Sequence, residues 1–330
     1  MKIAVVGLGA VGGLMAARLA AAGHAVSGLA RGATLAAVRE HGLRLAMGGA
    51  QTTAPIAVSD DAAALGPQDL VVVALKGPAL AAAAASLRPL LGAGTIVMPA
   101  MNGVPWWFLD AAPADAPLGD RRLASIDPDG RIAGALPTAR VLGCVVHLTC
   151  SSPEPGLIRH GFGDRLIVGE PAGGLSERAE AVRAALAGAG FTAEASADIR
   201  REVWYKLWGN MTMNPVSALT GAESHRIIDD PLVLAFMLGT MEEARQIGAR
   251  IGCTIAESGE ARMAVARQLG AFKTSMLQDA LAGRPLEIDA LVAAVHEIGT
   301  RLAIPTPNIG ALLGLTRLMA RERGLYPLAV

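Results

Sequence analysis

The first 19 residues, MKIAVVGLGAVGGLMAARL, decide the fold. The apolar, β-branched run 1–6 predicts a buried strand, and the residues after the glycines predict a helix. Between them Gly7 permits a tight turn, Gly9 lets the backbone approach a pyrophosphate, and Gly12 allows close helix packing. This strand–turn–helix context predicts a dinucleotide site at a helix N-terminus. The residues assigned to it are Gly7, Leu8, Gly9, Ala10, Val11 and Gly12.

The end of the second predicted strand, 25–30, indicates which dinucleotide is bound. NAD-specific sites carry an acidic residue about 20 positions after the glycines, where it holds the ribose hydroxyls. Residues 24–39 contain no Asp or Glu, and Arg31 stands where a 2′-phosphate would lie. The sequence therefore predicts NADPH (NADP) as the cofactor, in preference to NAD.

Further apolar runs alternate with helical stretches in the first half of the chain. Strands are expected at 69–75, 95–100 and 141–147, and a helix at 79–91. Such alternation is typical of a parallel sheet covered on both faces. Two short strands around residues 161–164 predict an antiparallel hairpin at the edge of that sheet.

The second half of the chain reads as helical after about residue 199, with breaks expected at Pro215, Pro231, Pro285 and Pro305. We therefore predict an N-terminal α/β Rossmann-type doubly wound domain, residues 1–198. An all-α substrate domain would follow, residues 199–330. The stretch 113–134, rich in Ala, Pro, Asp and Gly, is interpreted as a surface excursion within the first domain.

Composition excludes several classes of protein. Lys plus Arg (29) equals Asp plus Glu (29), and no basic patch is available for nucleic acid. No apolar run reaches the roughly 18 residues needed to span a bilayer, so no membrane partner is expected. The cysteines Cys144, Cys150 and Cys253 lack metal-binding spacing, so no metal is expected and a cytoplasmic location fits.

Two polar residues follow predicted strands of the first domain. Lys76 comes directly after 71–75, and Asn102 follows 95–101. Ligands of open α/β sheets bind beyond the carboxyl ends of the strands. Both residues are therefore expected to face the cofactor site.

Polar residues also recur in the predicted helices of the second domain. Lys206, Asn210 and Asn214 stand four residues apart and share one helix face. Burying such groups without partners is costly, so a stripe of three needs an explanation. Further on, Ser275 and Asp279 lie one turn apart. Pro285 is expected to start a helix with Glu287 in its first turn, where the dipole favours an ionised carboxylate.

Taken together, these pieces resemble the ketopantoate reductases (2-dehydropantoate 2-reductases), from Met1 to about Leu318. The resemblance is carried by Gly7 to Gly12, Arg31, Leu75-Lys76, Asn102-Gly103, Trp204 to Asn214, Ser275 to Asp279 and Leu286 to Asp289. It implies NADPH-dependent reduction of 2-dehydropantoate to (R)-pantoate, a step of pantothenate and coenzyme A biosynthesis. It further implies a small 2-oxo acid as the partner.

The resemblance also assigns residue roles. It makes Lys206 the general acid, with Glu287 holding both that lysine and the substrate hydroxyl. It places Lys76 and Asn102 beside the nicotinamide and substrate. It assigns substrate binding to Asn102, Asn210, Asn214, Ser275 and Asp279. The chain departs from shorter members at Trp106-Trp107-Phe108 and around residues 110–131, where aromatic rings at a pocket mouth would suit a larger substrate.

Two other functions stay open. The first is a D-2-hydroxy acid dehydrogenase acting with NAD on a mandelate-like acid; Arg31 argues against it, whereas Trp106 and Trp107 favour a bulkier substrate. The second is a non-catalytic NADP(H) sensor, which the fold alone permits. Such a sensor would not require Lys206 together with Glu287. The apolar helices of the second domain are also compatible with a homodimer.

Overall fold

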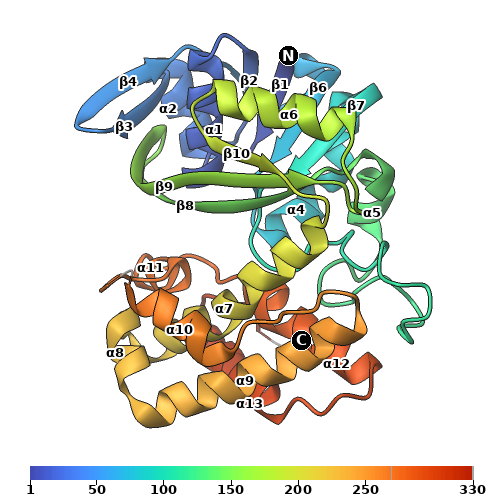
Figure 1. Ribbon diagram of the computed structural model, residues 1–330. Helices are drawn as coiled ribbons and strands as arrows, with labels where there is room; N and C mark the ends of the chain where they lie inside the picture. The colour runs from blue at the N-terminus through green and yellow to red at the C-terminus, as the bar shows by residue number, and fades with distance from the viewer. Residues whose placement is uncertain (269, 329–330) are drawn as a thin grey trace. The chain divides into compact units, whose positions relative to one another are not determined.

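The computed structural model describes residues 1–268 and 270–328 and divides into two compact units (Figure 1). The first unit comprises Met1–Met101 and Asp129–Glu202, and the second comprises Asn102–Pro128 and Val203–Val330. The division therefore differs from the continuous domains 1–198 and 199–330 expected from the sequence. The segment 102–128 belongs with the helices because its aromatic residues pack there: the Phe108 ring stacks on Trp204, with ring centroids 5.8 Å apart.

A five-stranded sheet in the first unit has the order β5-β2-β1-β6-β7, and all its pairings are parallel. The central strands are almost fully buried, which explains their continuous apolar sequences. The strand order reverses at β1, so the turn after β1 lies at the topological switch point where such sheets bind ligands. The strands are β1 (Lys2–Val6), β2 (Ala25–Leu29), β5 (Ala57–Ser59), β6 (Gln68–Val73) and β7 (Leu91–Pro99).

Short helices connect these strands. They are α1 (Ala10–Ala21), α2 (Gly32–His41), α3 (Ala62–Leu65), α4 (Gly77–Ala83), α5 (Arg131–Ala135) and the 3-10 helices Ala84–Leu90 and Thr138–Arg140. The expected helix 79–91 is thus confirmed as α4 followed by a 3-10 segment. The Rossmann-type fold of this unit is confirmed.

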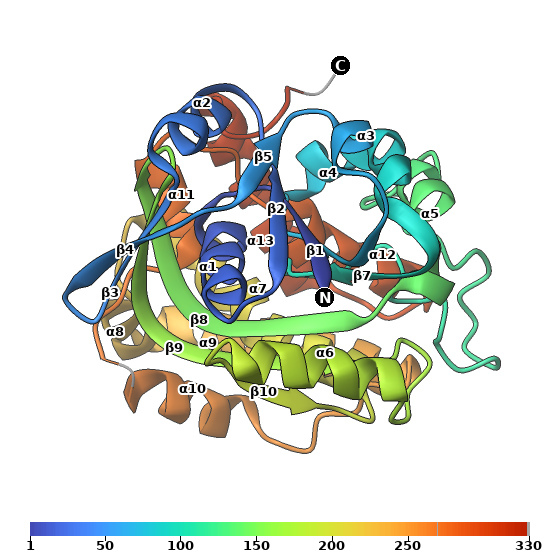
Figure 2. The same cartoon turned by 90° about the horizontal axis from the view of Figure 1, so that it is seen from above.

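A second sheet in the same unit has the order β10-β9-β3-β4, with β8 paired to β9. Helix α1 lies between the two sheets (Figure 2), and the core joins its Leu14 and Leu19 to Val5 of one sheet and Leu166 of the other. Helix α6 (Glu177–Gly188) packs on β9 and β10. The strands are β3 (Leu43–Met47), β4 (Ala50–Ala54), β8 (Gly143–Glu154), β9 (Leu157–Gly169) and β10 (Thr192–Ala195).

The hairpin expected around residues 161–164 is wrong in position. The turn lies at Pro155-Gly156, where Gly156 has φ +73°, and β8 and β9 pair antiparallel over most of their length. Gly161 instead lies within β9, where the register slips and a Cβ would approach Thr149 Oγ1 to 2.6 Å. The run 141–147 overlaps β8 and pairs in this second sheet, except for one parallel bridge from Val141 to β7.

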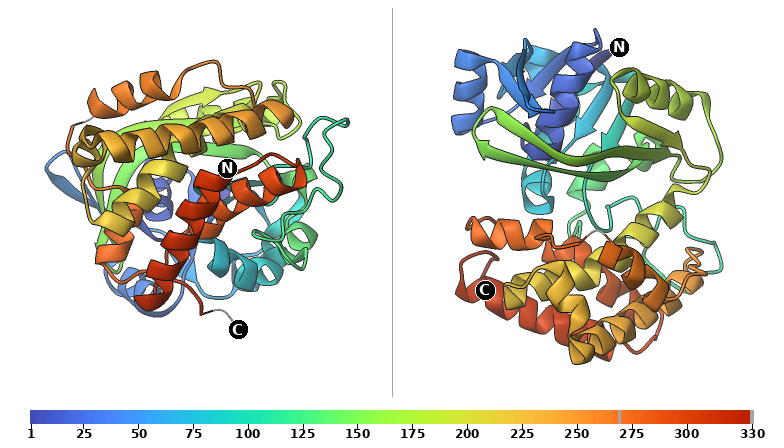
Figure 3. Two further views of the ribbon diagram at one scale, coloured as in Figure 1. Left: turned by 90° about the horizontal axis from the view of Figure 1, so that it is seen from below. Right: turned by 60° about the vertical axis from the view of Figure 1, so that its left-hand side comes forward.

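The second unit is helical in the part of the chain described, as expected. Helix α9 packs against α8, α10, α12 and α13, and Figure 3 shows this bundle from two sides. The helices are α7 (Ile199–Thr220), α8 (Ser224–Asp229), α9 (Pro231–Arg250), α10 (Gly259–Gln268), α11 (Ser275–Leu281), a π-helix (Asp289–Ala293), α12 (Ala294–Arg301) and α13 (Pro307–Glu322).

One of the expected helix breaks, at Pro215, is wrong. Helix α7 continues through Pro215, because the buried residues around it, such as Met211 and Val216, offset the lost backbone hydrogen bond. The break at Pro285 is confirmed, since residues 282–287 are not helical, but Pro285 does not start the next helix, whose first helical residue is Ile288. Within residues 1–268 and 270–328, no helix is long and apolar enough to cross a membrane.

Candidate functional site

The glycine loop between β1 and α1 is shaped by close backbone contacts. Gly7 has φ +92°, and a Cβ there would lie 2.8 Å from the carbonyl oxygen of Ala74. A Cβ on Gly12 would lie only 2.0 Å from the carbonyl oxygen of Gly7. The amide of Gly7 donates to the Leu29 carbonyl at 3.0 Å, which ties the loop to β2. Both glycines are therefore required by the fold itself.

Gly9 differs from these two glycines because nothing lies within 4 Å of where its Cβ would be. It is the N-cap residue of α1 and makes no side-chain cap. The first amides of a helix have no intrahelical acceptor and carry the positive end of the dipole. Open space beside these amides fits the pyrophosphate of a dinucleotide.

A cavity of about 270 Å³ lies at this loop. Arg31, the exposed N-cap residue of α2, lines it together with the loop, and none of the described lining residues is Asp or Glu. Arg39 is also exposed, but its guanidinium nitrogen lies 3.9 Å from Asp60 Oδ1, an ion pair typical of a solvated helix face. The cavity is lined by Val6, Gly7, Leu8, Gly9, Leu29, Ala30, Arg31, Thr34, Leu75, Ala79 and Ala83.

The remaining residues expected near the cofactor do not line this cavity. Ala10, Val11 and Gly12 form the first turn of α1 and do not line the cavity. Lys76 is the half-buried N-cap residue of α4, directly after the loop that follows β6. Asn102 belongs to the helical unit and is not among the residues that line the cavity.

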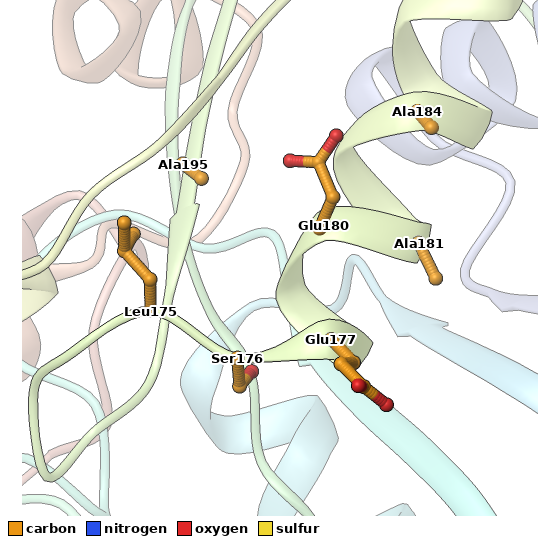
Figure 4. A pocket seen from close by; sticks show the side chains of 7 residues that line it. All are labelled: Leu175, Ser176, Glu177, Glu180, Ala181, Ala184 and Ala195. Atoms are coloured by element: carbon orange, nitrogen blue, oxygen red, sulfur yellow. The ribbon is translucent and has the colours of Figure 1, made fainter.

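A larger hollow of about 650 Å³ lies elsewhere in the first unit, beside α6 and β10. Figure 4 shows the side chains of Leu175 and Glu180 there, with Ala195 on the strand. Its lining offers two carboxylates, an exposed leucine and alanines, but no glycine turn and no cation. This larger hollow therefore lacks the features of a dinucleotide site that the glycine loop has.

Lys206 and Asn102 form the central polar contact of the helical unit. Lys206 Nζ donates a hydrogen bond to Asn102 Oδ1 at 2.7 Å, across 104 positions of the chain. Both side chains are half-buried. The contact explains how α7 accommodates a lysine among buried neighbours, because a charged donor near the interior needs an acceptor.

Asn210 and Asn214 lie one and two turns after Lys206 on α7, as the spacing predicts. Asn210 is half-buried, and Asn214 is 5% exposed. The Asn214 carbonyl accepts a hydrogen bond from Ser217 Oγ at 2.9 Å, so the helix around Pro215 is supported by a side chain.

Ser275 and Asp279 both lie on α11, one turn apart. Ser275 is exposed, whereas Asp279 accepts a 2.8 Å hydrogen bond from Arg284 Nε. Glu287 is half-buried and directly precedes the helical residues, so its expected place in a first helical turn is wrong. The Leu286 amide donates to the Leu325 carbonyl at 3.0 Å, which joins this non-helical stretch to the C-terminal residues.

The aromatic run after Asn102 does not lie at a pocket mouth. Trp106, Trp107 and Phe108 are 5%, 1% and 0% exposed, and Trp204 and Trp208 are equally buried. Trp208 Nε1 donates to the Met241 carbonyl at 2.7 Å. These rings form the core of the helical unit and give no support to a larger substrate.

Sequence reasoning missed the π-helix that follows Glu287. The Val104 amide donates to the carbonyl oxygen of Ala290 in that helix, at 2.8 Å. Gly103 fits tightly, since a Cβ there would lie 2.5 Å from the same oxygen. Part of this contact could be expected from the sequence, because an Asn-Gly pair indicates a turn. In the structure Gly103 has φ +83°, a conformation that favours glycine.

A glycine loop at the switch point of a doubly wound sheet, followed in the same chain by a helical unit with a half-buried contact between lysine and asparagine, is typical of Rossmann-type oxidoreductases. Two protein-family models match the chain and identify the family within this class. "Ketopantoate reductase PanE/ApbA" matches residues 3–114, and "Ketopantoate reductase PanE/ApbA C terminal" matches residues 198–320. The chain belongs to the ketopantoate reductase family.

Relatives of the chain agree with this assignment. The 2-dehydropantoate 2-reductase of Mesorhizobium japonicum is 44% identical over 99% of this chain and 100% of the relative. The enzyme of the same name from Halobacterium salinarum is 28% identical over 98% of this chain and its own full length. The chain is thus an oxidoreductase of the 2-dehydropantoate 2-reductase family.

Solved structures agree as well. A candidate ketopantoate reductase from Ralstonia solanacearum MolK2 superposes with a TM-score of 0.94 at 61% identity, covering 98% of this chain and 99% of that one. A D-mandelate dehydrogenase with NADH and anilino(oxo)acetate superposes with a TM-score of 0.82 at 19% identity, covering 98% and 100%. The second likeness concerns the fold alone.

Proposed function

We propose that this protein reduces 2-dehydropantoate to (R)-pantoate with NADPH, a step of pantothenate and coenzyme A biosynthesis. The observation that carries the proposal is the 2.7 Å hydrogen bond from Lys206 to Asn102. A half-buried ammonium group oriented by an amide oxygen is suited to donate a proton to a substrate carbonyl. The 44% identity to the Mesorhizobium japonicum enzyme supports the choice of substrate.

The residues of the glycine loop would hold the cofactor. Gly9 and the first turn of α1 would bind the pyrophosphate, with Ala10, Val11 and Gly12 supplying the helix start. Arg31 would bind the 2′-phosphate, because a guanidinium group pairs with a phosphate through two parallel hydrogen bonds. When bound, NADPH supplies the hydride that reduces the carbonyl carbon.

Lys206 would supply the proton in the same reaction. As the carbonyl oxygen gains negative charge, the Lys206 ammonium stabilises that charge and then transfers its proton to the oxygen. Asn102 accepts one of the three N–H bonds of Lys206 and so directs the others. Glu287 would orient Lys206 and accept a hydrogen bond from the product hydroxyl.

The remaining polar residues would grip the substrate. Asn210 and Asn214 follow Lys206 on α7, and Ser275 stands exposed at the start of α11. Asp279 would act together with Arg284, since the two side chains form an ion pair with the carboxylate mostly buried. Lys76 would lie beside the nicotinamide. Holding a reactant in one orientation removes part of the entropic barrier to reaction.

The competing mandelate-like activity rests on the likeness in fold to D-mandelate dehydrogenase. Arg31 and the lack of a carboxylate among the described lining residues of the cavity argue against its NAD preference. The burial of Trp106 and Trp107 removes the argument for a bulkier substrate. The sensor hypothesis gives the contact between Lys206 and Asn102 a structural role only.

A steady-state assay tests the proposal. Purified protein is given 2-dehydropantoate or phenylglyoxylate, with NADPH or NADH, and the loss of reduced-nicotinamide absorbance is followed. Fast consumption of NADPH with 2-dehydropantoate alone is expected. Preference for phenylglyoxylate and NADH would favour the mandelate-like enzyme, and NADPH binding without turnover on either acid would favour the sensor.

A further inference from the structure

The C-terminal residues after α13 bind the chain on both sides of Glu287. On one side, the Leu325 carbonyl accepts the Leu286 amide at 3.0 Å. On the other, the Tyr326 hydroxyl donates to Asp289 Oδ1 at 2.5 Å. Glu287 lies between these two anchors, so its backbone is fixed by residues nearly 40 positions later in the chain.

Asp289 opens the π-helix, and the same π-helix binds the stretch that carries Asn102. The Ala290 carbonyl accepts the Val104 amide at 2.8 Å, and Gly103 lies too close to that carbonyl for any side chain. π-Helical turns are rare and frequent at functional sites. One turn of backbone therefore adjoins Glu287 on one side and the Asn102–Lys206 contact on the other.

The hydrogen bond between Tyr326 and Asp289 is maintained over the pH range in which the Tyr326 phenol stays protonated. Burial and the neighbouring Asp289 carboxylate raise the pKa of Tyr326 to about 12, so the phenol stays a donor over the working pH range. Burial raises the pKa of Asp289, whereas the Tyr326 hydroxyl, Arg317 and Arg321 favour its charged form. Arg321 also lies 5.6 Å from the Tyr326 ring centroid and donates to the Pro327 carbonyl at 3.1 Å.

We propose that Tyr326 is a positioning residue for this active site. Through Asp289 and the π-helix it holds Glu287 and the Asn102 segment in the arrangement that the reaction needs. Tyr326 itself takes no part in proton or hydride transfer. The proposal rests on the proposed roles of Glu287, Asn102 and Lys206.

The first test is Tyr326→Phe, which removes one hydroxyl and keeps the ring. We expect kcat to fall roughly tenfold, because the transition state depends on the placement of Lys206 and Glu287, while KM for NADPH stays unchanged. Asp289→Asn keeps an acceptor oxygen and should retain more activity than Asp289→Ala. A uniform loss in both Asp289 variants, or an unchanged kcat in Tyr326→Phe, overturns the proposal.

Thr316→Val is the matched control, because it also removes one hydroxyl from this part of the chain. Thr316 is buried on α13, and its hydroxyl donates to the Leu312 carbonyl of the same helix at 2.7 Å, so this bond does not reach the π-helix. A comparable loss of thermal stability is expected in both variants. If kcat falls equally in Thr316→Val, Tyr326 has a general structural role only and the proposal fails.

Hydrogen exchange of the free protein gives a readout that needs no substrate. The Val104 amide should exchange roughly tenfold faster in Tyr326→Phe than in wild type or Thr316→Val, because its acceptor is in the π-helix. Unchanged exchange at Val104 overturns the proposal. If wild-type protein fails to reduce 2-dehydropantoate, the proposed substrate is wrong, and this exchange comparison alone decides the role of Tyr326.

Discussion

Glu297 binds Ser125 across 172 positions of the chain: Oε2 accepts the Ser125 amide at 2.9 Å and the Ser125 hydroxyl at 2.6 Å. The other oxygen accepts the Ala124 amide at 2.9 Å. Arg301, one turn later on α12, pairs with Glu297 and donates to the Asp120 and Arg122 carbonyls. This cluster joins residues 120–125 of the 102–128 segment to helix α12.

The Glu297 cluster makes stability depend on pH. Burial alone would raise the pKa of Glu297, but hydrogen bonds from Ser125 and Ala124, together with Arg301, lower it below 4.5. A carboxyl whose pKa is lowered on folding adds stability above its unfolded value and loses it as pH falls through the folded value. Glu297→Gln should therefore lower the free energy of unfolding by about 2 kcal/mol near pH 7, with a smaller difference in acid.

Urea unfolding at several pH values measures this effect. Glu242→Gln is the control, because Glu242 pairs with Arg245 on an exposed face with 48% of its side chain accessible. Such a surface pair should contribute only about 0.5 kcal/mol or less. A Glu297→Gln difference that stays constant from pH 7 to pH 3 would contradict the assigned linkage.

The open space beside Gly9 gives a prediction about cofactor binding. Gly9→Ala adds a methyl group with no neighbour within 4 Å, so the fold should stay intact. The same methyl group would occupy the approach of a pyrophosphate, and NADPH affinity should fall roughly a hundredfold. Isothermal titration measures the affinity, and thermal unfolding reports on the fold.

Two other glycine variants serve as controls for Gly9→Ala. Gly188→Ala, also with no neighbour within 4 Å, should leave NADPH affinity unchanged. Gly12→Ala should destabilise the protein, because its Cβ would overlap the Gly7 carbonyl. Normal NADPH affinity in Gly9→Ala would remove the cofactor from this loop.

Arg31 is predicted to select the cofactor. Arg31→Ala should raise KM for NADPH at least tenfold and change KM for NADH little, because only NADPH carries the 2′-phosphate. Arg39→Ala is the control: Arg39 lies on the same helix but faces Asp60, and neither KM should change. Equal changes for both cofactors in Arg31→Ala would argue against a phosphate contact.

Local signals predicted the parallel sheet well. The apolar runs around β1, β2, β6 and β7 are buried on both faces, and such strands are recognisable without knowing their partners. The β3–β4 hairpin also had a signal that was not used, since Gly48-Gly49 between two short runs is typical of a two-residue turn.

The remaining features depend on contacts between distant residues, which a single sequence does not reveal. The sequence places Glu287 in a first helical turn, whereas the helix begins one residue later, and the bond from the neighbouring Leu286 amide to the Leu325 carbonyl joins residues 39 positions apart. The sequence suggests that Trp106 to Phe108 lie at a pocket mouth, because it does not reveal that the Phe108 ring stacks on Trp204 in the core. The α7 stripe was predictable from spacing, whereas the pairing of Lys206 with Asn102 was not.

Lys206 carries the prediction most closely tied to the proposed chemistry. Lys206→Ala should lower kcat by roughly two to four orders of magnitude, because the developing alkoxide loses its proton donor. NADPH affinity should stay nearly unchanged, since the glycine loop and Arg31, which are proposed to hold the phosphates, are not altered. Asn102→Ala, which removes only the orienting acceptor, should cost about tenfold.

The measurement combines steady-state kinetics with titration of NADPH into each variant. Lys2→Ala, at the exposed start of β1, controls for the loss of one positive charge and should keep wild-type turnover. If Lys206→Ala turns over normally, the proton comes from another group, and the contact with Asn102 is structural. If Asn102→Ala loses as much activity as Lys206→Ala, the amide has a direct role at the substrate in addition to orienting the lysine.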